Sequence, residues 1–507
     1  MCLIVLAFVV VFVTDEPMNV MITMSVIVIL LFLSSGSMLG AVNRIAISVS
    51  HDESVEMTLG RKIIFSLSYS FAAILIMAIW FIGYNPGSYQ PDCIYQFSQA
   101  MTGVYSDWHP VLQTVFTYTI PLRITGGAVW APVVFQLVFF SLSMGYMCET
   151  IHEYMGKRWA FLSLLYIILN PFTAQMMLYP WKDAPFAIMG MISVIIAFRI
   201  YVTGSEWADS WWRCLILSIV LSCTSIFRHN GILFSVPLLI AMVFIMKRRQ
   251  WVITLTAFVV FTVLIKGGLY RAIDVNPDPQ SVVQQVGLPL TIIGNVAKET
   301  PELMDEEVSE FVYKIAPQEV WENGYQLGNF GVMKYYAPIN SQVIEDEGAW
   351  SILKMGIRCF YLSPRASFKA AFALTDLVYG VDLLDEGYIG SHIEDNSLGI
   401  VYNGNPRVVH ILEIYYKLVR MHGINFFRQS AFSLLMMLTV LLSVCNLHLW
   451  NDWKKVLLVL PIFLYSFGTM LLLTDPASRF FFIGYLVCPV YLSLLTYDYK
   501  CVDGGSR

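Results

Sequence analysis

The sequence predicts an all-α polytopic membrane protein with about eleven to twelve transmembrane helices. Three observations support this class. Of the 507 residues 57% are hydrophobic, only 13% are charged, and uncharged apolar runs of roughly spanning length recur along the chain. Soluble domains carry about 25% charged residues. The net charge of −5 gives no reason to expect a nucleic-acid partner, and the nine scattered cysteines lack the spacing of a zinc site or a disulfide framework.

A transmembrane helix needs about 20 apolar residues, or fewer where side chains at its ends reach the interface. The runs that meet this requirement are 18–35, 62–83, 128–148, 159–179, 184–203, 212–227, 231–246, 251–267, 430–447, 456–473 and 479–497. Met1–Val13 adds a short first span rather than a signal peptide, because it has no basic n-region and no small-residue cleavage site.

Lysines and arginines near the span ends predict the orientation, because they prefer the cytoplasmic side. With Arg61 and Lys62 placed inside, alternation puts the other basic clusters at span ends inside as well. The outer side then receives the loop 84–127, the segment 268–429 and the turns YPWKDAP, RHNG and TDPASR.

We therefore expect four regions along the chain. Residues 1–61 form N-terminal spans and a cytoplasmic loop, and residues 62–267 form a transmembrane core that includes the outer loop 84–127. Residues 268–429, which are more polar, form a mainly helical extracytoplasmic insertion. Residues 430–507 supply the C-terminal transmembrane helices and a short cytoplasmic tail.

Within the insertion, TPELMDEEVSEFVYKIAP is expected to start a helix at Thr300 and Pro301, with an acidic first turn. SPRASFKAAFALTDLVYGV is a second helical stretch, expected along the membrane interface because aromatic and basic residues alternate in it. The turn-rich part 376–406 is expected to hold one or two short strands.

The loop 84–127 begins with an unusual carboxylate. Asp92, in SYQPDCIYQ, lies among aromatic residues, a proline and a cysteine, a few residues after a predicted span. A carboxylate held in an apolar setting close to a hydroxyl group serves as a general base. The alternative is an Asx turn or a helix N-cap, with Pro91 just before it.

The motif YSDWHP adds Asp107 and His109 to the same loop. The two side chains suit an acceptor pocket, a phosphate site or part of a metal site, although a metal site needs three or more protein ligands. The alternative is a simple turn before the helix PVLQTVFTYTI, with Pro110 at its first position.

Three cations in short outer turns contradict the positive-inside preference: Lys182, Arg228 and Arg479. An anionic ligand at the outer face would explain them. Lysine can bind a phosphate as a point charge near a helix N-terminus, and arginine binds phosphate oxygens through its planar fork. Asp183 and His229, the neighbours of two of these cations, are candidate pocket residues.

Each of these turns also has a simpler explanation. Asp183 suits a helix cap, and Asn230 and Gly231 suit a tight turn between two helices. In TDPASR, Asp475 suits a helix cap, and Arg479 follows it at the spacing of an i,i+4 ion pair. The gathering of acids and cations on one predicted face is the stronger observation.

Together these features resemble the GT-C glycosyltransferases that use polyprenyl-phosphate-linked sugars, such as protein O-mannosyltransferases and aminoarabinose transferases. The motifs PGSYQPD, DWHP, YPWKDAPFA, RHNG and PRASFKAAFALTDLVYG look more closely like an uncharacterised family of bacterial multipass proteins grouped with them. Better-known GT-C families often carry an Asp-Glu or Asp-x-Asp pair in the first loop. Here Cys93 follows Asp92 and the next acid is Asp107, which favours a single base over a metal-dependent mechanism.

The resemblance implies an inverting transfer of a sugar from a polyprenyl phosphate to an acceptor hydroxyl of a glycan, lipid or protein. Asp92 would be the catalytic base; Lys182, Arg228 and Arg479 would bind the donor phosphate; Asp107, His109, Asp183 and His229 would line the acceptor pocket. No cofactor is required, and a divalent metal is compatible but not indicated. The alternatives are a lipid-linked oligosaccharide polymerase, and a lipid or glycan transporter or flippase.

Overall fold

The computed structural model describes residues 57–277, 282–379, 390–421 and 453–497. Within these ranges the chain is helical, and its β pairing is limited to isolated bridges, among them Tyr89 with Ile393. The expected strands in 376–406 are therefore absent from the described part of that segment. The predicted spans at Met1–Val13, 18–35 and 430–447 lie outside the described residues.

Six helical runs are long and apolar enough to cross a membrane, which confirms the polytopic all-α class within the described ranges. They are α3 (Leu59–Gly83), α7 (Ala131–Met155), α10 (Asp183–Val202), the run Arg248–Ala272 from α13 to α14, α25 (Trp453–Leu472), and the run Ser478–Leu495 that contains most of α26 (Phe482–Thr496). The predicted spans 212–227 and 231–246 appear as shorter apolar helices, α11 (Trp211–Ile226) and the run His229–Phe244 around α12 (Ile232–Ala241).

The predicted span 159–179 is broken. α8 (Lys157–Ile168) and α9 (Pro171–Leu178) meet at an angle of 61°. Asn170 causes the break, because its side chain accepts a hydrogen bond from the backbone N–H of Phe172 and so caps a new helix. At the C-terminal end of α9, the carbonyl oxygens of Met176, Met177 and Tyr179 lie 3.3, 3.1 and 2.8 Å from the carboxamide nitrogen of Gln136.

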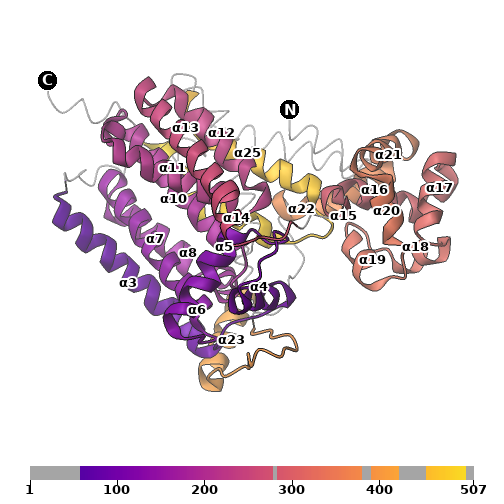
Figure 1. Ribbon diagram of the computed structural model, residues 1–507, viewed down its shortest axis with the longest axis horizontal. Helices are drawn as coiled ribbons and strands as arrows, with labels where there is room; N and C mark the ends of the chain where they lie inside the picture. Colours follow the sequence, from indigo (N-terminus) through magenta and orange to yellow (C-terminus); the bar gives the residue numbers. More distant parts are fainter. Residues whose placement is uncertain (1–56, 278–281, 380–389, 422–452, 498–507) are drawn as a thin grey trace. The chain divides into compact units, whose positions relative to one another are not determined.

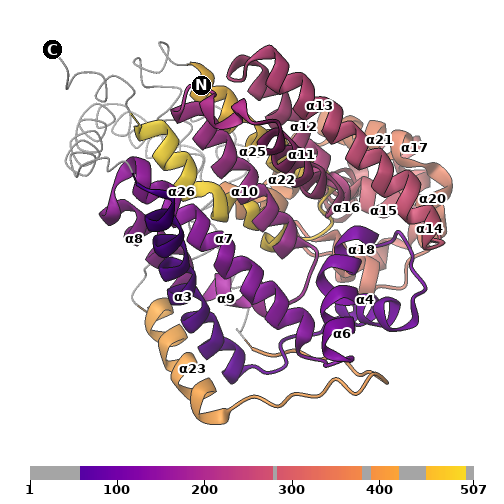
Figure 2. The same ribbon diagram turned by 60° about the vertical axis from the view of Figure 1, so that its left-hand side comes forward.

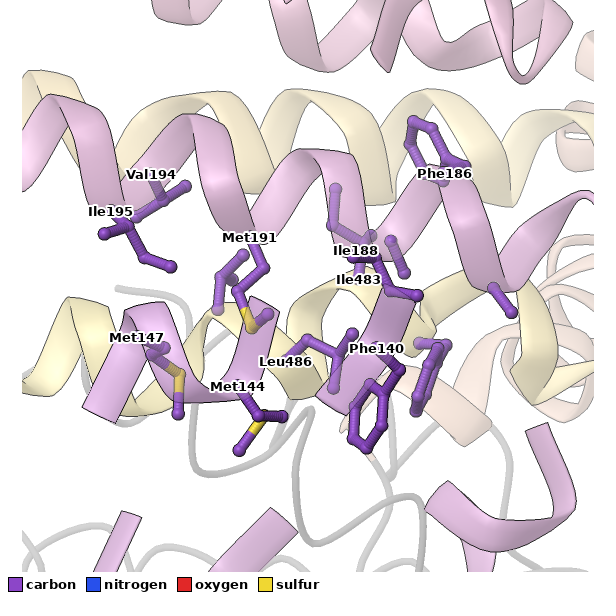
Figure 3. Close-up of a cluster of buried hydrophobic side chains, with 14 of the residues drawn as sticks. Phe140, Met144, Met147, Phe186, Ile188, Met191, Val194, Ile195, Ile483 and Leu486 are labelled. Carbon is purple, nitrogen blue, oxygen red and sulfur yellow. The ribbon is translucent and has the colours of Figure 1, made fainter. Parts of the chain in front are cut away.

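The chain divides into two compact units. Among the described residues, unit 1 comprises 282–379 and 466–478, and unit 2 comprises 57–277, 390–421, 453–465 and 479–497. In unit 2, α7, α10 and α26 pack around Phe140, Met144, Met191 and Leu486, all almost fully buried (Figures 1 and 3).

α3 packs along α7, and α23 (Pro406–Met421) packs against α3 (Figure 2). The close approach of α3 and α7 depends on Gly145. A Cβ atom there would lie 2.3 Å from the carbonyl oxygen of Ser66. Small residues at helix contacts permit such close backbone packing in membranes.

The described part of unit 1 has its own apolar core, in which Leu290, Ile293, Val296 and Trp321 are buried. Its helices are α15 (Val282–Gln285), α16 (Gly287–Glu299), α17 (Glu306–Ile315), α18 (Gln318–Gly324), α19 (Phe330–Tyr336), α20 (Ser341–Glu347), α21 (Ala349–Leu362) and α22 (Pro364–Tyr379).

Two details of unit 1 bear on the sequence interpretation. A helical turn does start at Thr300 and Pro301, as expected, but it is only the 3₁₀-helix Pro301–Leu303; α17 starts separately at Glu306, where the Asp305 carboxylate accepts from the N–H of Val308 and caps it. The second expected helix is α22, which packs against α16 and buries Ala366 and Ala370 in the core of unit 1; its position along the membrane interface stays a prediction.

Candidate functional site

All the candidate site residues that the sequence predicts belong to unit 2. Asp92 lies in the first turn of α4 (Pro91–Thr102), whose N-cap is Gln90 and makes no side-chain capping bond. Asp92 is therefore not the cap. Its side chain is 43% exposed, so it is only partly shielded by the apolar residues that surround it in sequence.

His109 lies between the carboxylate and a cation. Its Nε2 atom is 3.8 Å from Oδ1 of Asp92, and its Nδ1 atom is 3.2 Å from Nζ of Lys182. Burial, together with the nearby positive charge of Lys182, lowers the pKa of His109 to about 2, so the imidazole is neutral. Because an ammonium group only donates, we assign the ring proton to Nε2, on the side of Asp92.

Lys182 is the N-cap residue of α10 and is half-buried. Burial lowers the pKa of its ammonium group to about 8; the negative charges of Asp183 and Asp92 oppose this shift, and the positive charges of Arg228 and Arg479 add to it. Four other charged side chains of the candidate site therefore act electrostatically on this one ammonium group.

Arg228 and Asp183 form a buried ion pair. The guanidinium Nη1 lies 2.8 Å from Oδ1 of Asp183, and both side chains are less than 10% exposed. The same nitrogen donates to the hydroxyl of Tyr465 at 2.8 Å, and the guanidinium lies 4.4 Å from the ring centroid of Phe480. Asp183 is thus the counter-ion of Arg228 rather than a helix cap, since the N-cap of α10 is Lys182.

The RHNG turn requires its glycine for space. The turn is the short 3₁₀-helix His229–Gly231 between α11 and α12. A Cβ atom on Gly231 would lie 2.2 Å from the carbonyl oxygen of Thr224. The close turn fixes the backbone directly after Arg228, which is its N-cap residue.

Arg479 lies in the 3₁₀-helix Ser478–Phe481. Its guanidinium carbon is 4.6 Å from the ring centroid of Trp181 and 5.0 Å from that of Phe480. Because the helical turn begins only at Ser478, Asp475 does not cap it and the two residues do not share one helix. The i,i+4 ion pair offered as the simpler explanation therefore lacks its helical geometry.

Asp107 and His229 form the other side of the candidate site. Burial raises the pKa of the Asp107 carboxyl, and the charges of His229 and Lys266 oppose that shift. The His229 Nε2 group donates to the carbonyl of Trp108, at 3.4 Å.

Pro110 is the N-cap of α5 (Val111–Thr114) rather than its first residue. Among the described residues, no group of three or more His, Cys, Asp or Glu side chains could hold a metal ion.

Three residues that the sequence did not single out complete this arrangement: Trp181, Tyr465 and Phe480. A sequence signal existed for Tyr465, because a hydroxyl in an apolar spanning helix needs a hydrogen-bond partner; here it donates to the carbonyl of Phe480 at 2.9 Å. The rings of Trp181 and Phe480 had no such signal, because their position beside a guanidinium depends on tertiary packing.

The fold and the site define a polytopic membrane protein with an exposed carboxylate beside three clustered cations. The chain belongs to a family described as "Family of unknown function (DUF6020)", whose family model matches residues 9–325. No curated protein matches the chain. Among solved structures, it is similar to the crystal structure of ArnT from Cupriavidus metallidurans bound to undecaprenyl phosphate, with 12% identity and a TM-score of 0.31, covering 84% of this chain and 77% of that chain.

Proposed function

We propose that this protein is a membrane glycosyltransferase that moves a sugar from a polyprenyl-phosphate donor to an acceptor hydroxyl at the outer membrane face. The observation that carries the proposal is the charge distribution around Lys182. Arg228 and Arg479 add two positive charges there; of the two carboxylates that act on Lys182, Asp183 is paired with Arg228, and Asp92 has a side chain that is 43% exposed.

This arrangement suits the two charges that an inverting transfer develops. The acceptor oxygen forms a bond to the anomeric carbon of the sugar, the bond from that carbon to the phosphate oxygen breaks, and Asp92 takes the acceptor proton. The lipid phosphate leaves with the bonding electrons. Lys182, Arg228 and Arg479 stabilise its negative charge, as preorganised cations do in a partly buried site.

The buried contacts assign supporting roles to other residues. Asp183 and Tyr465 hold the Arg228 guanidinium in place, and the rings of Trp181 and Phe480 flank Arg479. Asp107 and His229 belong to the acceptor side of the pocket in this proposal. The donor's lipid chain would lie between spans, which accounts for a reaction centre at the bilayer surface.

The experiment supplies membranes containing the protein with a labelled polyprenyl-phosphate sugar and follows release of the label from lipid. The parent is expected to transfer the label to a water-soluble, lipid or protein acceptor, and Asp92→Asn to transfer it slowly while still binding the donor. Arg228→Ala and Arg479→Ala are expected to weaken donor binding. Equal turnover by Asp92→Asn and the parent would remove Asp92 as the base.

The same assay separates the alternative functions. A polymerase would lengthen a lipid-linked chain rather than transfer single sugars. A transporter or flippase would move the labelled lipid across the bilayer with its sugar–phosphate bond intact. Recovery of intact donor on the opposite leaflet, with no cleavage, would replace the proposed activity by transport.

A further inference from the structure

The helix α21 of unit 1, labelled in Figure 1, has an outer face of unusual composition. Trp350, Ile357 and Tyr361 are 68%, 51% and 83% exposed, and Lys354 is exposed between them. The spacings of four, three and four residues place all four side chains on one side of the helix. The Lys354 ammonium lies 5.4 Å from the Trp350 ring centroid.

The side of α21 opposite this face already packs against the apolar core of unit 1. α21 buries Ile352, Met355, Gly356 and Cys359 on its opposite side, toward the apolar core of unit 1. A helix between a core and water normally carries charged or polar residues on its outer side. The aromatic side chains on the outer face of α21 are therefore not required by the packing of unit 1.

Two neighbouring helices show the ordinary pattern. The exposed residues of α17 include Glu306, Glu307 and Glu310, and those of α20 include Asp346 and Glu347. The four residues of this outer face include no carboxylate and one ammonium group; beside them, the exposed Arg358 of α21 pairs with Asp305 and with Glu307 of α17. Unit 1 thus presents acidic helices and one aromatic, basic helix to its surroundings.

The bilayer is the partner that the rest of the chain supplies. Residues 466–472 of unit 1 are the last part of the spanning helix α25 (Trp453–Leu472), so unit 1 itself includes the end of a candidate transmembrane span. Trp and Tyr are enriched at membrane interfaces, where lysine can extend its ammonium group to the headgroups.

We infer that the outer face of α21, formed by Trp350, Lys354, Ile357 and Tyr361, rests on the phospholipid headgroup layer of the membrane. The aromatic rings and Ile357 enter the interface, and Lys354 pairs with lipid phosphate. The acidic helices α17 and α20 face water, because anionic headgroups would repel them. This contact does not depend on the proposed transfer reaction.

The test places the full chain, containing 5-fluorotryptophan, in nanodiscs of phosphatidylethanolamine and phosphatidylglycerol. The variant Trp350→Phe identifies the fluorine resonance of Trp350. We expect a gadolinium chelate attached to lipid headgroups to broaden this resonance strongly, and a soluble chelate to broaden it weakly. The reverse order would place Trp350 in water and overturn the inference.

A matched pair of substitutions checks that lipid contact depends on this face. Tyr361 and Tyr336 are both 83% exposed, but Tyr336 lies on α19. Ile357→Glu combined with Tyr361→Asp is expected to abolish broadening by the lipid-bound chelate, whereas Tyr336→Asp preserves it. Protection of Trp350 from both chelates would show that protein covers the face, from this chain or another, and would also overturn the inference.

Discussion

The two ends of α10 hold buried charges in different ways. Near its C-terminal end, Arg199 pairs with Glu149 and Glu153 and donates to the Thr150 hydroxyl at 3.0 Å, while Lys62 pairs with Glu153. Two cations thus face two carboxylates in direct contact. The side chains of Glu149 and Arg199 are almost completely buried, so this cluster joins α3, α7 and α10 with no charge left over.

At the N-terminal end of α10, Lys182, Arg228 and Arg479 face two carboxylates, Asp183 and Asp92. Asp183 is already paired with Arg228, and the partly exposed Asp92 is 3.8 Å from a neutral imidazole. The difference suggests separate tasks. A closed cluster of direct ion pairs stabilises helix packing, whereas a cluster of cations next to a partly exposed carboxylate is suited to bind an anion.

The change expected to separate the two ends most is Asp92→Asn. If Asp92 is the general base, transfer should fall by about 10²- to 10⁴-fold. The thermal unfolding temperature should not change, because the Asp92 side chain is 43% exposed and makes no close ion pair. Single-turnover sugar release and thermal unfolding measure the two effects. A variant that unfolds early would make Asp92 a structural residue like those at the other end.

At the balanced end, Arg199→Met should act on stability instead. Removing the cation leaves the deeply buried Glu149 without a counter-ion, while Glu153 keeps Lys62, at a cost of about 3–5 kcal/mol. Chemical unfolding of purified protein in detergent measures this loss. The control is Lys62→Met, which leaves Glu153 paired with Arg199 and should cost about 1 kcal/mol. Full stability in Arg199→Met would contradict the assigned role.

The site at the N-terminal end of α10 should have a pH-dependent activity, whereas the ion-pair cluster near the C-terminal end should contribute no such dependence. Burial lowers the pKa of Lys182 from 10.5 to about 8, so its positive charge and the donor affinity should be lost as pH rises through about 8. A falling alkaline limb of kcat/KM would report this in the free enzyme. Between pH 8 and 10.5 the unfolded chain binds more protons at this lysine, so its contribution to stability becomes more favourable as pH rises.

The control for this limb is Lys182→Arg, because arginine stays protonated over the whole range. The variant is expected to lose part of its rate from altered geometry but to keep a flat alkaline profile. An unchanged alkaline limb in Lys182→Arg would assign the titration to another group.

The smallest effect is expected for Tyr465→Phe. The hydroxyl accepts from Arg228 at 2.8 Å and donates to the Phe480 carbonyl at 2.9 Å. Its removal should cost about 1–3 kcal/mol of stability, because one hydrogen bond involves a charged group. Donor affinity should decrease slightly and the rate constant for sugar release should not change. A large loss of that rate constant would give Tyr465 a direct part in the chemistry.

Hydropathy predicted the spans well where one unbroken helix is long enough to cross a membrane, as for α3 and α10. It did not predict the 61° bend between α8 and α9 within the span 159–179, because an apolar window does not register a cap such as Asn170. The positive-inside rule located Lys182 and Arg228 as exceptional cations. The pairing of Arg228 with Asp183 and the position of His109 were not predictable, because they depend on side chains distant in sequence meeting in space.

The break between α8 and α9 has a consequence for Lys182. An interrupted helix in a membrane leaves backbone carbonyls that need other donors. Here Gln136 serves Met176, Met177 and Tyr179, the hydroxyl of Tyr118 binds the carbonyl of Pro180, and the backbone N–H of Ser88 binds that of Leu178. The backbone segment that leads to Lys182 is therefore held in place by hydrogen bonds before a ligand binds. A cation on such a preorganised support needs little reorganisation to meet a phosphate.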